Sequence, residues 1–269
     1  MLGLLALDAI PDVFATVMQA SLLLLAGLFA LSVLSGGTAA VLGFGIGSLL
    51  TPYLAGVSGL APEVVVAAVA LPHLLATALR FVQHQRSVDR RAFVRFGVWS
   101  AVGGLAGALL QPWLASQALL GVLGLLLVAT GIAQVTRGVR EWHPESGWVP
   151  ALGLLSGVGG GLVGNQGGLR AAGLAPFGLP PRTFVATSTA VALAVDLVRT
   201  PVYLWRHGSA LADWRIPIGV AVVGCLIGTV LGERVLLGLS PHRYRLAIGA
   251  AIALVGLWLV AQGTGLAGP

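Results

Sequence analysis

Residues 156–181 read SGVGGGLVGNQGGLRAAGLAPFGLPP. This stretch is rich in glycine and proline, and it carries Asn165, Gln166 and Arg170 in an otherwise apolar context. Hydrocarbon offers the backbone no hydrogen-bond partners, so an irregular segment at membrane depth is tolerated only against protein or a water-filled cavity. Glycines that interrupt a helix there also create a new helix N-terminus, whose N–H groups attract an anion. We therefore expect half of an anion-binding site here, if the chain spans a membrane.

The composition of the whole chain is that of a membrane protein. Of its 269 residues, 57% are hydrophobic and only 9% are charged, and the mean hydropathy is +0.95. A soluble domain could not cover its surface with so few charges, whereas a spanning helix needs about 20 apolar residues. The basic residues behind the net charge of +6 are all arginines. They lie mainly between hydrophobic segments, as in cytoplasmic loops, so we expect a polytopic α-helical membrane protein without a nucleic-acid partner.

Motifs of enzymes and cofactor sites are not found in the sequence. Cys225 is the only cysteine, which excludes an intrachain disulfide and a thiolate metal cluster. The glycine spacing at residues 159–164 fits a dinucleotide fingerprint, but no βαβ unit surrounds it. We expect no catalytic residues, no metal and no cofactor. The first residues lack the basic region of a secretory signal, and we take them as the mature start. The remaining histidines outside the apolar segments stand apart in separate loops: His84, His143, His207 and His242.

Apolar segments separated by glycine, proline and charged residues follow the same order in both halves of the chain. In the first half we expect segments at 13–34, 38–55, 61–82, 96–110 and 114–135, with a polar loop at 84–95. In the second half we expect 148–155 leading into the glycine-rich stretch, then 183–205, 216–231 and 246–260, with a polar loop at 206–215. The last two segments of each half form a helical hairpin.

The two halves are related by an internal repeat. At an offset of 121 residues, Ser35-Gly36 matches Ser156-Gly157, Gly43 matches Gly164, Gly103 matches Gly224 and Gly107 matches Gly228. At an offset of 119, residues 60–62 match 179–181 and Arg80 matches Arg199. We predict one integral membrane domain made of two repeats, 1–140 and 141–269. The two GxxxG motifs are interpreted as helix-packing surfaces.

Loop charge indicates that the repeats have opposite orientations in the membrane. Residues 86–95 carry a net +3, while the equivalent loop 206–215 carries +1. Residues 233–245 carry +2, while the equivalent QPWLAS turn carries none. The basic loop changes place between the repeats, as an inverted topology requires. Each repeat then crosses an odd number of times, either as five spans or as a re-entrant hairpin followed by three spans. Both place the N- and C-termini outside.

The matching broken segments, 35–52 and 156–181, are the predicted substrate site. Paired Gly/Pro interruptions indicate a transporter site, and we favour this over close helix packing because packing needs no Asn, Gln and Arg. Asn165 and Gln166 have two open roles, capping of broken backbone and binding of oxyanions. Arg170 binds an anion or extends to a membrane surface. The candidate substrate-binding residues are Asn165, Gln166, Arg170, Gly164, Gly167, Ser35, Thr38, Gly43, Thr187 and Ser188.

Charged residues on two other helices have alternative interpretations. Asp196 and Arg199 are three residues apart and share a helix face; we favour an internal ion pair slightly over proton coupling. Arg80 and Arg199 lie near the ends of their segments, and we expect both to extend to the membrane surface. His73 is expected to be a hydrogen-bonded core residue, with proton transfer as the weaker alternative. Hydroxyls in mid-helix, such as Ser35 and Thr38, usually bond the preceding turn.

From 21 to 260 the sequence resembles the sulfite exporter TauE/SafE family, also called the toluenesulfonate uptake permease family. The stretch that most specifically resembles this family is the second glycine-rich segment, followed by Leu179-Pro180-Pro181 and then Ala186-Thr187-Ser188. The first repeat matches less closely, since Val69 and Ala70 replace the hydroxyl pair. The resemblance implies secondary transport of a small sulfur oxyanion, usually outward, in the bacterial cytoplasmic membrane among its lipids. A homodimer is left open.

The predicted function is export of sulfite or an organosulfonate such as sulfoacetate, by alternating access around a midplane site between the broken segments. An interior-negative membrane favours outward movement of a monoanion by about 2.3 kcal/mol per 100 mV, so export needs no coupled ion. Uptake would need a proton, with Asp196 or His73 as its carrier. The alternatives are a transporter of another small anion, a proton-coupled uptake permease and a non-transporting membrane assembly protein.

Overall fold

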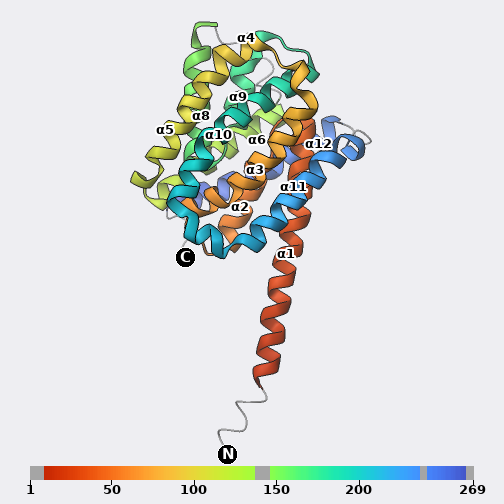
Figure 1. Ribbon diagram of the computed structural model, residues 1–269, viewed down its shortest axis with the longest axis vertical. Coiled ribbons are helices and arrows are strands. Elements are labelled where there is room, and N and C mark those ends of the chain that lie inside the picture. The colour runs from red at the N-terminus through yellow and green to blue at the C-terminus, as the bar shows by residue number, and fades with distance from the viewer. Residues whose placement is uncertain (1–8, 137–145, 237–240, 265–269) are drawn as a thin grey trace, which may run out of the picture.

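The computed structural model is helical throughout the residues that it describes, which are 9–136, 146–236 and 241–264 for the backbone (Figure 1). Side chains are described over 22–136, 147–232 and 246–264. Seven stretches within this part are long and apolar enough to cross a membrane. In chain order the α-helices are α1 (Ala9–Leu42), α2 (Ile46–Val57), α3 (Pro62–His84), α4 (Arg90–Ala92), α5 (Val98–Leu110), α6 (Ser116–Thr136), α8 (Val149–Val163), α9 (Gly167–Leu174), α10 (Pro181–Asp213), α11 (Arg215–Leu236) and α12 (Pro241–Gly263).

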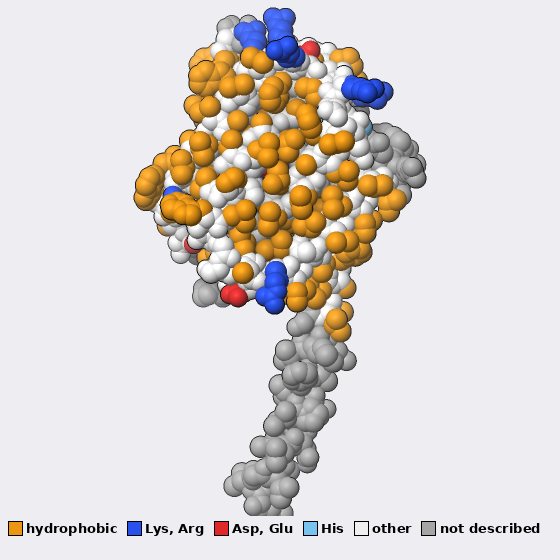
Figure 2. All heavy atoms as spheres, in the orientation of Figure 1, with side chains coloured by type: hydrophobic (Ala, Val, Ile, Leu, Met, Phe, Trp, Pro, Cys, Tyr) orange, Lys and Arg blue, Asp and Glu red, His pale blue; other side chains and the backbone are white. Residues whose placement is uncertain are grey.

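The surface of the folded chain is apolar where a membrane would surround it. Figure 2 shows hydrophobic side chains over the middle of one face, with arginine and acidic side chains gathered toward its two ends. Many large apolar side chains are exposed, among them Leu23, Leu125 and Leu254. In water such a surface would drive association, whereas in lipid it is the surface that a spanning bundle needs. The protein is a multi-pass membrane protein.

Close helix pairs are made through glycine. In α5, a Cβ at Gly103 would lie 2.1 Å from the Leu154 carbonyl oxygen of α8. In α11, a Cβ at Gly228 would lie 2.0 Å from the Val33 carbonyl oxygen of α1. The prediction that both GxxxG motifs pack helices is confirmed. α6 pairs with α12 in the same way, since a Cβ at Gly131 would lie 2.5 Å from an α12 carbonyl.

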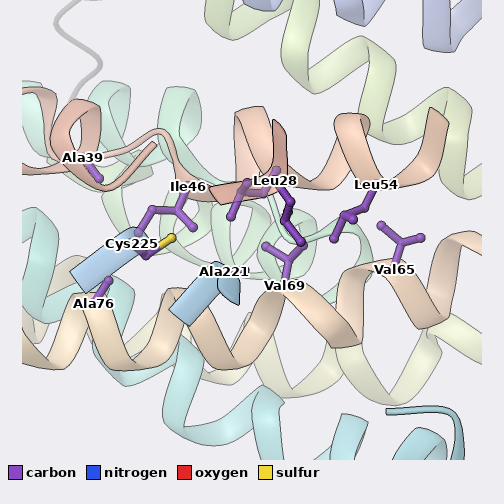
Figure 3. Close-up of a cluster of buried hydrophobic side chains, with 10 residues drawn as sticks. Leu28, Ala39, Ile46, Leu54, Val65, Val69, Ala76, Ala221 and Cys225 are labelled. Atoms are coloured by element: carbon purple, nitrogen blue, oxygen red, sulfur yellow. The ribbon is translucent and has the colours of Figure 1, made fainter. Parts of the chain in front are cut away.

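Helices α3 and α10 form the centre of the bundle. They pack against each other, and 61% of each span is buried, more than in any other candidate span of the described chain. A cluster of buried apolar side chains fixes α2 between α1, α3 and α11 (Figure 3). Its members include Leu28, Ile46, Val69 and Ala221. This packing positions the short helix α2 beside the buried centre.

The first interruption lies later in the chain than predicted. Helix α1 continues through the Ser35-Gly36-Gly37 sequence and ends at Leu42. The reason is packing: a Cβ at Gly36 would lie 2.2 Å from the Cys225 carbonyl oxygen of α11. The chain instead breaks at Gly43 and Gly45, whose φ angles of 80° and 142° favour glycine. Helix α2 begins directly afterwards.

The second interruption is shorter than residues 156–181. Helix α8 continues to Val163 through most of the glycines, because they meet α5 closely. A Cβ at Gly157 would lie 2.0 Å from the Ser100 carbonyl oxygen, and one at Gly161 would lie 2.1 Å from that of Gly104. Close packing is therefore the correct interpretation of these glycines. The break itself spans residues 164–166, and it starts at Gly164 with a φ of 74°.

Three long helices follow each break: α3, α5 and α6 after the first, and α10, α11 and α12 after the second. The predicted hairpins 96–135 and 216–260 are wrong: within the described chain α5 packs on α8, α6 on α12 and α11 on α1, because their glycine-lined faces meet those helices closely. The predicted loop at 206–215 is wrong, because α10 continues to Asp213 and only Trp214 separates it from α11. No proline interrupts residues 202–213, so the helix keeps its backbone bonded as far as the membrane surface. Residues 137–145 lie outside the described residues, as do the charged side chains at 233–245 that entered the loop-charge prediction.

Candidate functional site

The two breaks lie against each other in the buried centre, although 121 residues separate Gly43 from Gly164. A Cβ at Gly47 would lie 2.2 Å from the Gly164 carbonyl oxygen. A Cβ at Gly167 would lie 2.8 Å from the Phe44 side chain. Glycine is needed at these positions because backbone from one half meets backbone or side chain from the other. The structure thus brings the two predicted broken segments together.

Two helix N-termini open at this junction. Helix α2 starts after Gly45, which has no side chain to cap it. Helix α9 starts after Gln166, whose side chain makes no capping hydrogen bond. Asn165 contributes a long contact, in which its Oδ1 accepts from the Gly167 backbone N–H at 3.4 Å. Its Oδ1 also lies 3.5 Å from Ser48 Oγ of α2. The first-turn N–H groups of a helix are unpaired within it and carry partial positive charge.

Three polar side chains of the second break bury donor groups without partners. The unpaired atoms are Asn165 Nδ2, Gln166 Nε2, and both Nε and Nη1 of Arg170. These residues are only 3%, 5% and 2% exposed, so the expected alternative for Arg170, extension to the membrane surface, is wrong. A buried donor without an acceptor costs about 1–3 kcal/mol, and more when it is charged. Buried donors of this kind need an explanation, such as an ordered water, a bound ion or a ligand.

Arg170 also ties the two halves together. Its Nη2 donates to the Gly43 carbonyl oxygen at 2.9 Å. Ser188 of α10 donates from Oγ to the same carbonyl at 3.4 Å. Gly43, Arg170 and Ser188 were predicted from three separate segments, and they meet at this one oxygen.

The other predicted hydroxyls have different partners. Ser35 Oγ donates to the Leu31 carbonyl at 2.6 Å and Thr38 Oγ1 donates to the Leu34 carbonyl at 2.7 Å. Both therefore bond the preceding turn of α1, as mid-helix hydroxyls usually do. Thr187 Oγ1 accepts from the Asp89 backbone N–H at 2.9 Å. It fastens the basic loop to the start of α10 instead of contacting a break.

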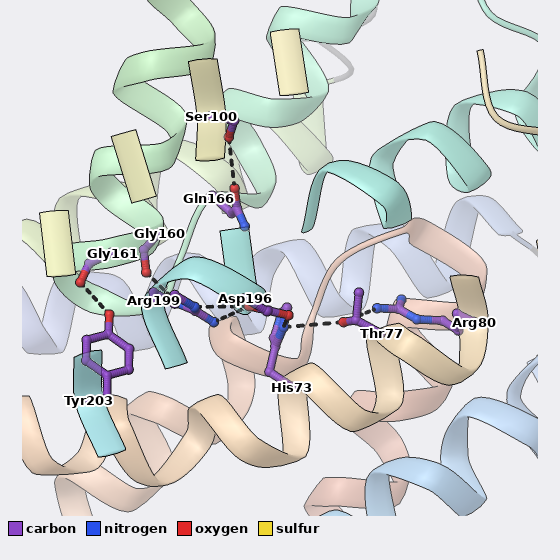
Figure 4. A network of polar contacts seen from close by, with 10 residues as sticks. All are labelled: His73, Thr77, Arg80, Ser100, Gly160, Gly161, Gln166, Asp196, Arg199 and Tyr203. Atoms are coloured by element: carbon purple, nitrogen blue, oxygen red, sulfur yellow. Dashed lines mark hydrogen bonds and ion pairs between the residues drawn. The ribbon is translucent and has the colours of Figure 1, made fainter. Parts of the chain in front are cut away.

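A chain of polar contacts runs through the centre between α3 and α10 (Figure 4). Asp196 Oδ1 is 2.8 Å from Arg199 Nη2, which confirms the predicted ion pair. Asp196 Oδ2 is 2.6 Å from His73 Nδ1. His73 is buried and hydrogen-bonded, as expected for a core histidine. Its pairing with Asp196 could not be found from sequence, because nothing local brings residue 73 to residue 196.

Arg80 and Arg199 do not extend to the membrane surface as expected. Each is 2% exposed. Arg80 donates from Nη1 to the Ala39 carbonyl of α1, and Arg199 donates from Nη1 to the Gly160 carbonyl of α8. Both carbonyls lie in the last turn of a broken helix, where the negative end of the helix dipole attracts a cation. The arginines find their counter-charge inside the protein.

Two further residues anchor the second break. Tyr203 Oη donates to the Gly161 carbonyl, and Gln111 Nε2 donates to the Leu162 carbonyl at 2.7 Å. Sequence reasoning missed both. A signal existed for each, since a tyrosine hydroxyl and an amide in apolar surroundings need a partner when buried. The sequence alone could not say that the partner is the end of α8.

The buried charges of this centre do not balance. Among the described residues, the buried arginines are Arg80, Arg170 and Arg199, and the only buried acid is Asp196. With His73 neutral, the excess is two positive charges. Uncompensated charge at membrane depth is expensive, and a bound anion would reduce that cost. No three His, Cys, Asp or Glu side chains of the described part lie together in a way that could hold a metal ion.

A cavity of about 170 Å³ adjoins the second break. Its polar end is formed by Asn165 and Gln166, while α6 and α9 supply a mainly apolar wall. The remaining lining residues are Leu126, Ala129, Thr130, Ala133, Gly168, Leu169 and Ala172. One water takes up about 30 Å³ of liquid, so the space is large enough for a small solvated anion.

These features define a class: a multi-pass helical membrane protein with buried arginines and unpaired donors where two broken helices meet. The family comparison is more specific. The model of the sulfite exporter TauE/SafE family matches residues 2–259, and the chain belongs to this family. Its members are transporters and not enzymes, and the family implies a sulfur oxyanion as substrate. Neither the curated proteins nor the solved structures gave a match to this chain.

Proposed function

We propose that this protein exports a small sulfur-containing anion, sulfite or an organosulfonate such as sulfoacetate, through a site between its two broken helical segments. The observation that carries the proposal is the set of unpaired, buried donors on Asn165, Gln166 and Arg170. An oxyanion has acceptors for all of them. The excess of buried positive charge supports the same assignment.

We assign anion binding to groups of the second break. Arg170 keeps Nε and Nη1 unpaired, and each of these charged N–H donors can bind an oxygen of a sulfonate or of sulfite. The amides of Asn165 and Gln166 and the N-terminus of α9 supply further donors. Gly164 and Gly167 let backbone approach closely. Gly43 and Ser188 would support Arg170, while Ser35, Thr38 and Thr187, whose oxygens have protein partners, would line the path.

The proposed mechanism is alternating access by two inverted repeats. The helix packing is consistent with two equivalent repeats. When each helix is replaced by its counterpart in the other repeat, the α1–α11 pair becomes the α8–α5 pair. The α3–α10 and α6–α12 pairs each consist of two counterparts. Both α1 and α8 end at a glycine of positive φ. Rocking of one repeat against the other would expose a site at their junction first to one side and then to the other.

The proposed orientation places the segment 84–95 in the cytoplasm. This segment was predicted as a loop, but short helical turns, α4 among them, make up most of it. Arg86, Arg90 and Arg91 are exposed on this segment, and the Asp89–Thr187 contact holds it at the start of α10. Arg182, also exposed, adds to the positive charge of this end. Excess arginine marks the cytoplasmic side, so the termini would lie outside, in the cytoplasmic membrane of a bacterium.

Membrane potential alone suffices to drive export. Outward movement of a monoanion gains about 2.3 kcal/mol per 100 mV of interior-negative potential. The second candidate function is proton-coupled uptake, and the buried His73–Asp196 contact of 2.6 Å favours it. The two differ in one measurement: an imposed pH gradient without a potential drives movement of a sulfonate, which stays ionised on both sides, only if protons are coupled.

Thermal unfolding in detergent against a panel of anions tests the proposed site. The panel contains sulfite, sulfate, thiosulfate, sulfoacetate, taurine and acetate at matched cation and ionic strength. A ligand at 100 times its dissociation constant adds about 2.7 kcal/mol to the free energy of unfolding. We expect the unfolding temperature to rise selectively with a sulfur oxyanion, and we expect Arg170→Ala to remove this rise. The same unfolding temperature with every anion would count against the site.

A further inference from the structure

Arg80 and Arg199 make matching contacts at the ends of the two broken helices. The Ala39 carbonyl, which accepts from Arg80, also accepts the Gly43 N–H at 3.0 Å. The Gly160 carbonyl, which accepts from Arg199, also accepts the Gly164 N–H at 3.1 Å. Each arginine therefore binds the carbonyl that closes the last turn before a break.

Each arginine also has a second acceptor three residues earlier on its own helix. Arg80 Nη2 donates to Thr77 Oγ1 at 3.1 Å. Arg199 Nε donates to Asp196 Oδ1 at 3.0 Å. Such contacts use the fork of the guanidinium, whose separate nitrogens reach two acceptors at once. Each broken helix is thereby fixed to a central helix, α1 to α3 and α8 to α10.

The two fixed ends belong to one connected network. His73 Nδ1 lies 2.6 Å from Asp196 Oδ2 and 3.3 Å from Thr77 Oγ1. The network therefore continues from Arg199 through Asp196, His73 and Thr77 to Arg80 (Figure 4). Replacing a buried ion pair by apolar residues of similar size is often neutral or stabilising, so stability alone does not explain this network. The network connects the ends of α1 and α8.

We propose that Arg80 and Arg199 are positioning residues of the anion site: through their carbonyl contacts they hold the two breaks so that the donors of Asn165, Gln166 and Arg170 converge. The inference rests on the proposed function, because it concerns the same site. Neither arginine needs to touch the anion. This positioning depends on the guanidinium reaching two acceptors at once, in addition to its charge.

The experiment compares Arg80→Lys, Arg199→Lys and the control Arg86→Lys in the full-length protein in detergent. All three keep the charge, and Arg86 is exposed on the basic loop. Backbone hydrogen exchange by mass spectrometry reports the breaks without any ligand, and a sulfite titration reports the site. Losing a hydrogen bond to a charged group changes a local equilibrium about tenfold or more.

We expect Arg80→Lys to speed exchange of residues 40–46 about tenfold, and Arg199→Lys to do the same for residues 161–167. Both should weaken sulfite binding about tenfold, while Arg86→Lys changes neither readout. Unchanged exchange at the breaks, or sulfite binding at the unaltered level in both variants, would overturn the inference. If a lysine variant does not fold, Thr77→Val removes the side-chain acceptor of Arg80, together with the Thr77–His73 contact, and must raise exchange at 40–46.

The two readouts keep the inference separate from the proposed function. If the unaltered protein does not bind sulfite, the proposed function fails for sulfite, whereas the exchange measurement still decides whether the arginines hold the breaks. If sulfite binds equally well to both lysine variants, binding stands and the positioning role fails.

Discussion

Gln166→Leu should stabilise the anion-free protein while weakening anion binding. Gln166 Nε2 is buried without a partner, and its Oε1 accepts only a long contact of 3.4 Å from Ser100 Oγ. An unpaired buried polar group costs about 1–3 kcal/mol, and a weak hydrogen bond returns about 0.5–1 kcal/mol. Leucine has a similar size and no polar atoms. We therefore expect the free energy of unfolding without anion to rise by about 1 kcal/mol.

The same substitution removes a donor from the anion. A hydrogen bond to a charged group contributes about 1.5–3 kcal/mol, so the dissociation constant for sulfite should rise about 10- to 150-fold. Sulfite at 100 times the original dissociation constant adds about 2.7 kcal/mol to the unaltered protein and at most about 1.4 kcal/mol to the variant. For a chain of this size, 1 kcal/mol shifts the unfolding temperature by about 2–4 °C. Thermal unfolding in detergent at fixed sodium and ionic strength resolves this difference.

Gln117→Leu is the control. Gln117 is exposed near the start of α6, so this substitution should change the free energy of unfolding by less than about 0.5 kcal/mol and leave the sulfite-induced shift intact. Our reasoning is refuted if Gln166→Leu destabilises the protein and keeps the full shift with sulfite, as the control does.

Three further predictions concern stability and orientation. Asp196→Asn leaves Arg199 buried without its counter-charge and should cost about 3–5 kcal/mol in unfolding measurements; a loss below 1 kcal/mol would contradict the ion pair. Gly107→Ala places a Cβ 2.4 Å from the Val158 carbonyl oxygen and should cost about 1–3 kcal/mol, whereas Gly121→Ala, with open space around it, should be neutral or stabilising. A cysteine introduced by Arg91→Cys should react with an impermeant maleimide in inside-out vesicles but not in intact cells; labelling of intact cells would reverse the proposed orientation.

Composition and the positions of glycine, proline and charged residues between apolar segments predicted the class of the protein and most of its helices. The strongest result concerns the breaks, because Gly43 and Gly164 were matched by sequence offset and both end a helix with positive φ. Asn165, Gln166 and Arg170 were also identified from sequence, since such side chains are rare in apolar segments. These features depend on residue type and local order, which a single sequence contains.

Features that depend on a distant partner could not be predicted. The glycines at 36 and 157 were read as breaks, but each meets a backbone carbonyl of another helix, and sequence does not reveal that neighbour. Arg80 and Arg199 were expected at the surface because their acceptors, two main-chain carbonyls, have no sequence signature. The length of α10 was misjudged because charged residues at a helix end look like a loop.

Sulfite flux in proteoliposomes under an imposed potential tests the central claim most directly. The account predicts that a potential negative on the cytoplasmic side speeds sulfite movement away from that side, beyond the rate of empty liposomes. It also predicts that Asn165→Ala, Gln166→Ala and Arg170→Ala each slow this flux at equal protein content. Flux equal to that of empty liposomes, or flux unchanged in all three variants, would contradict the account.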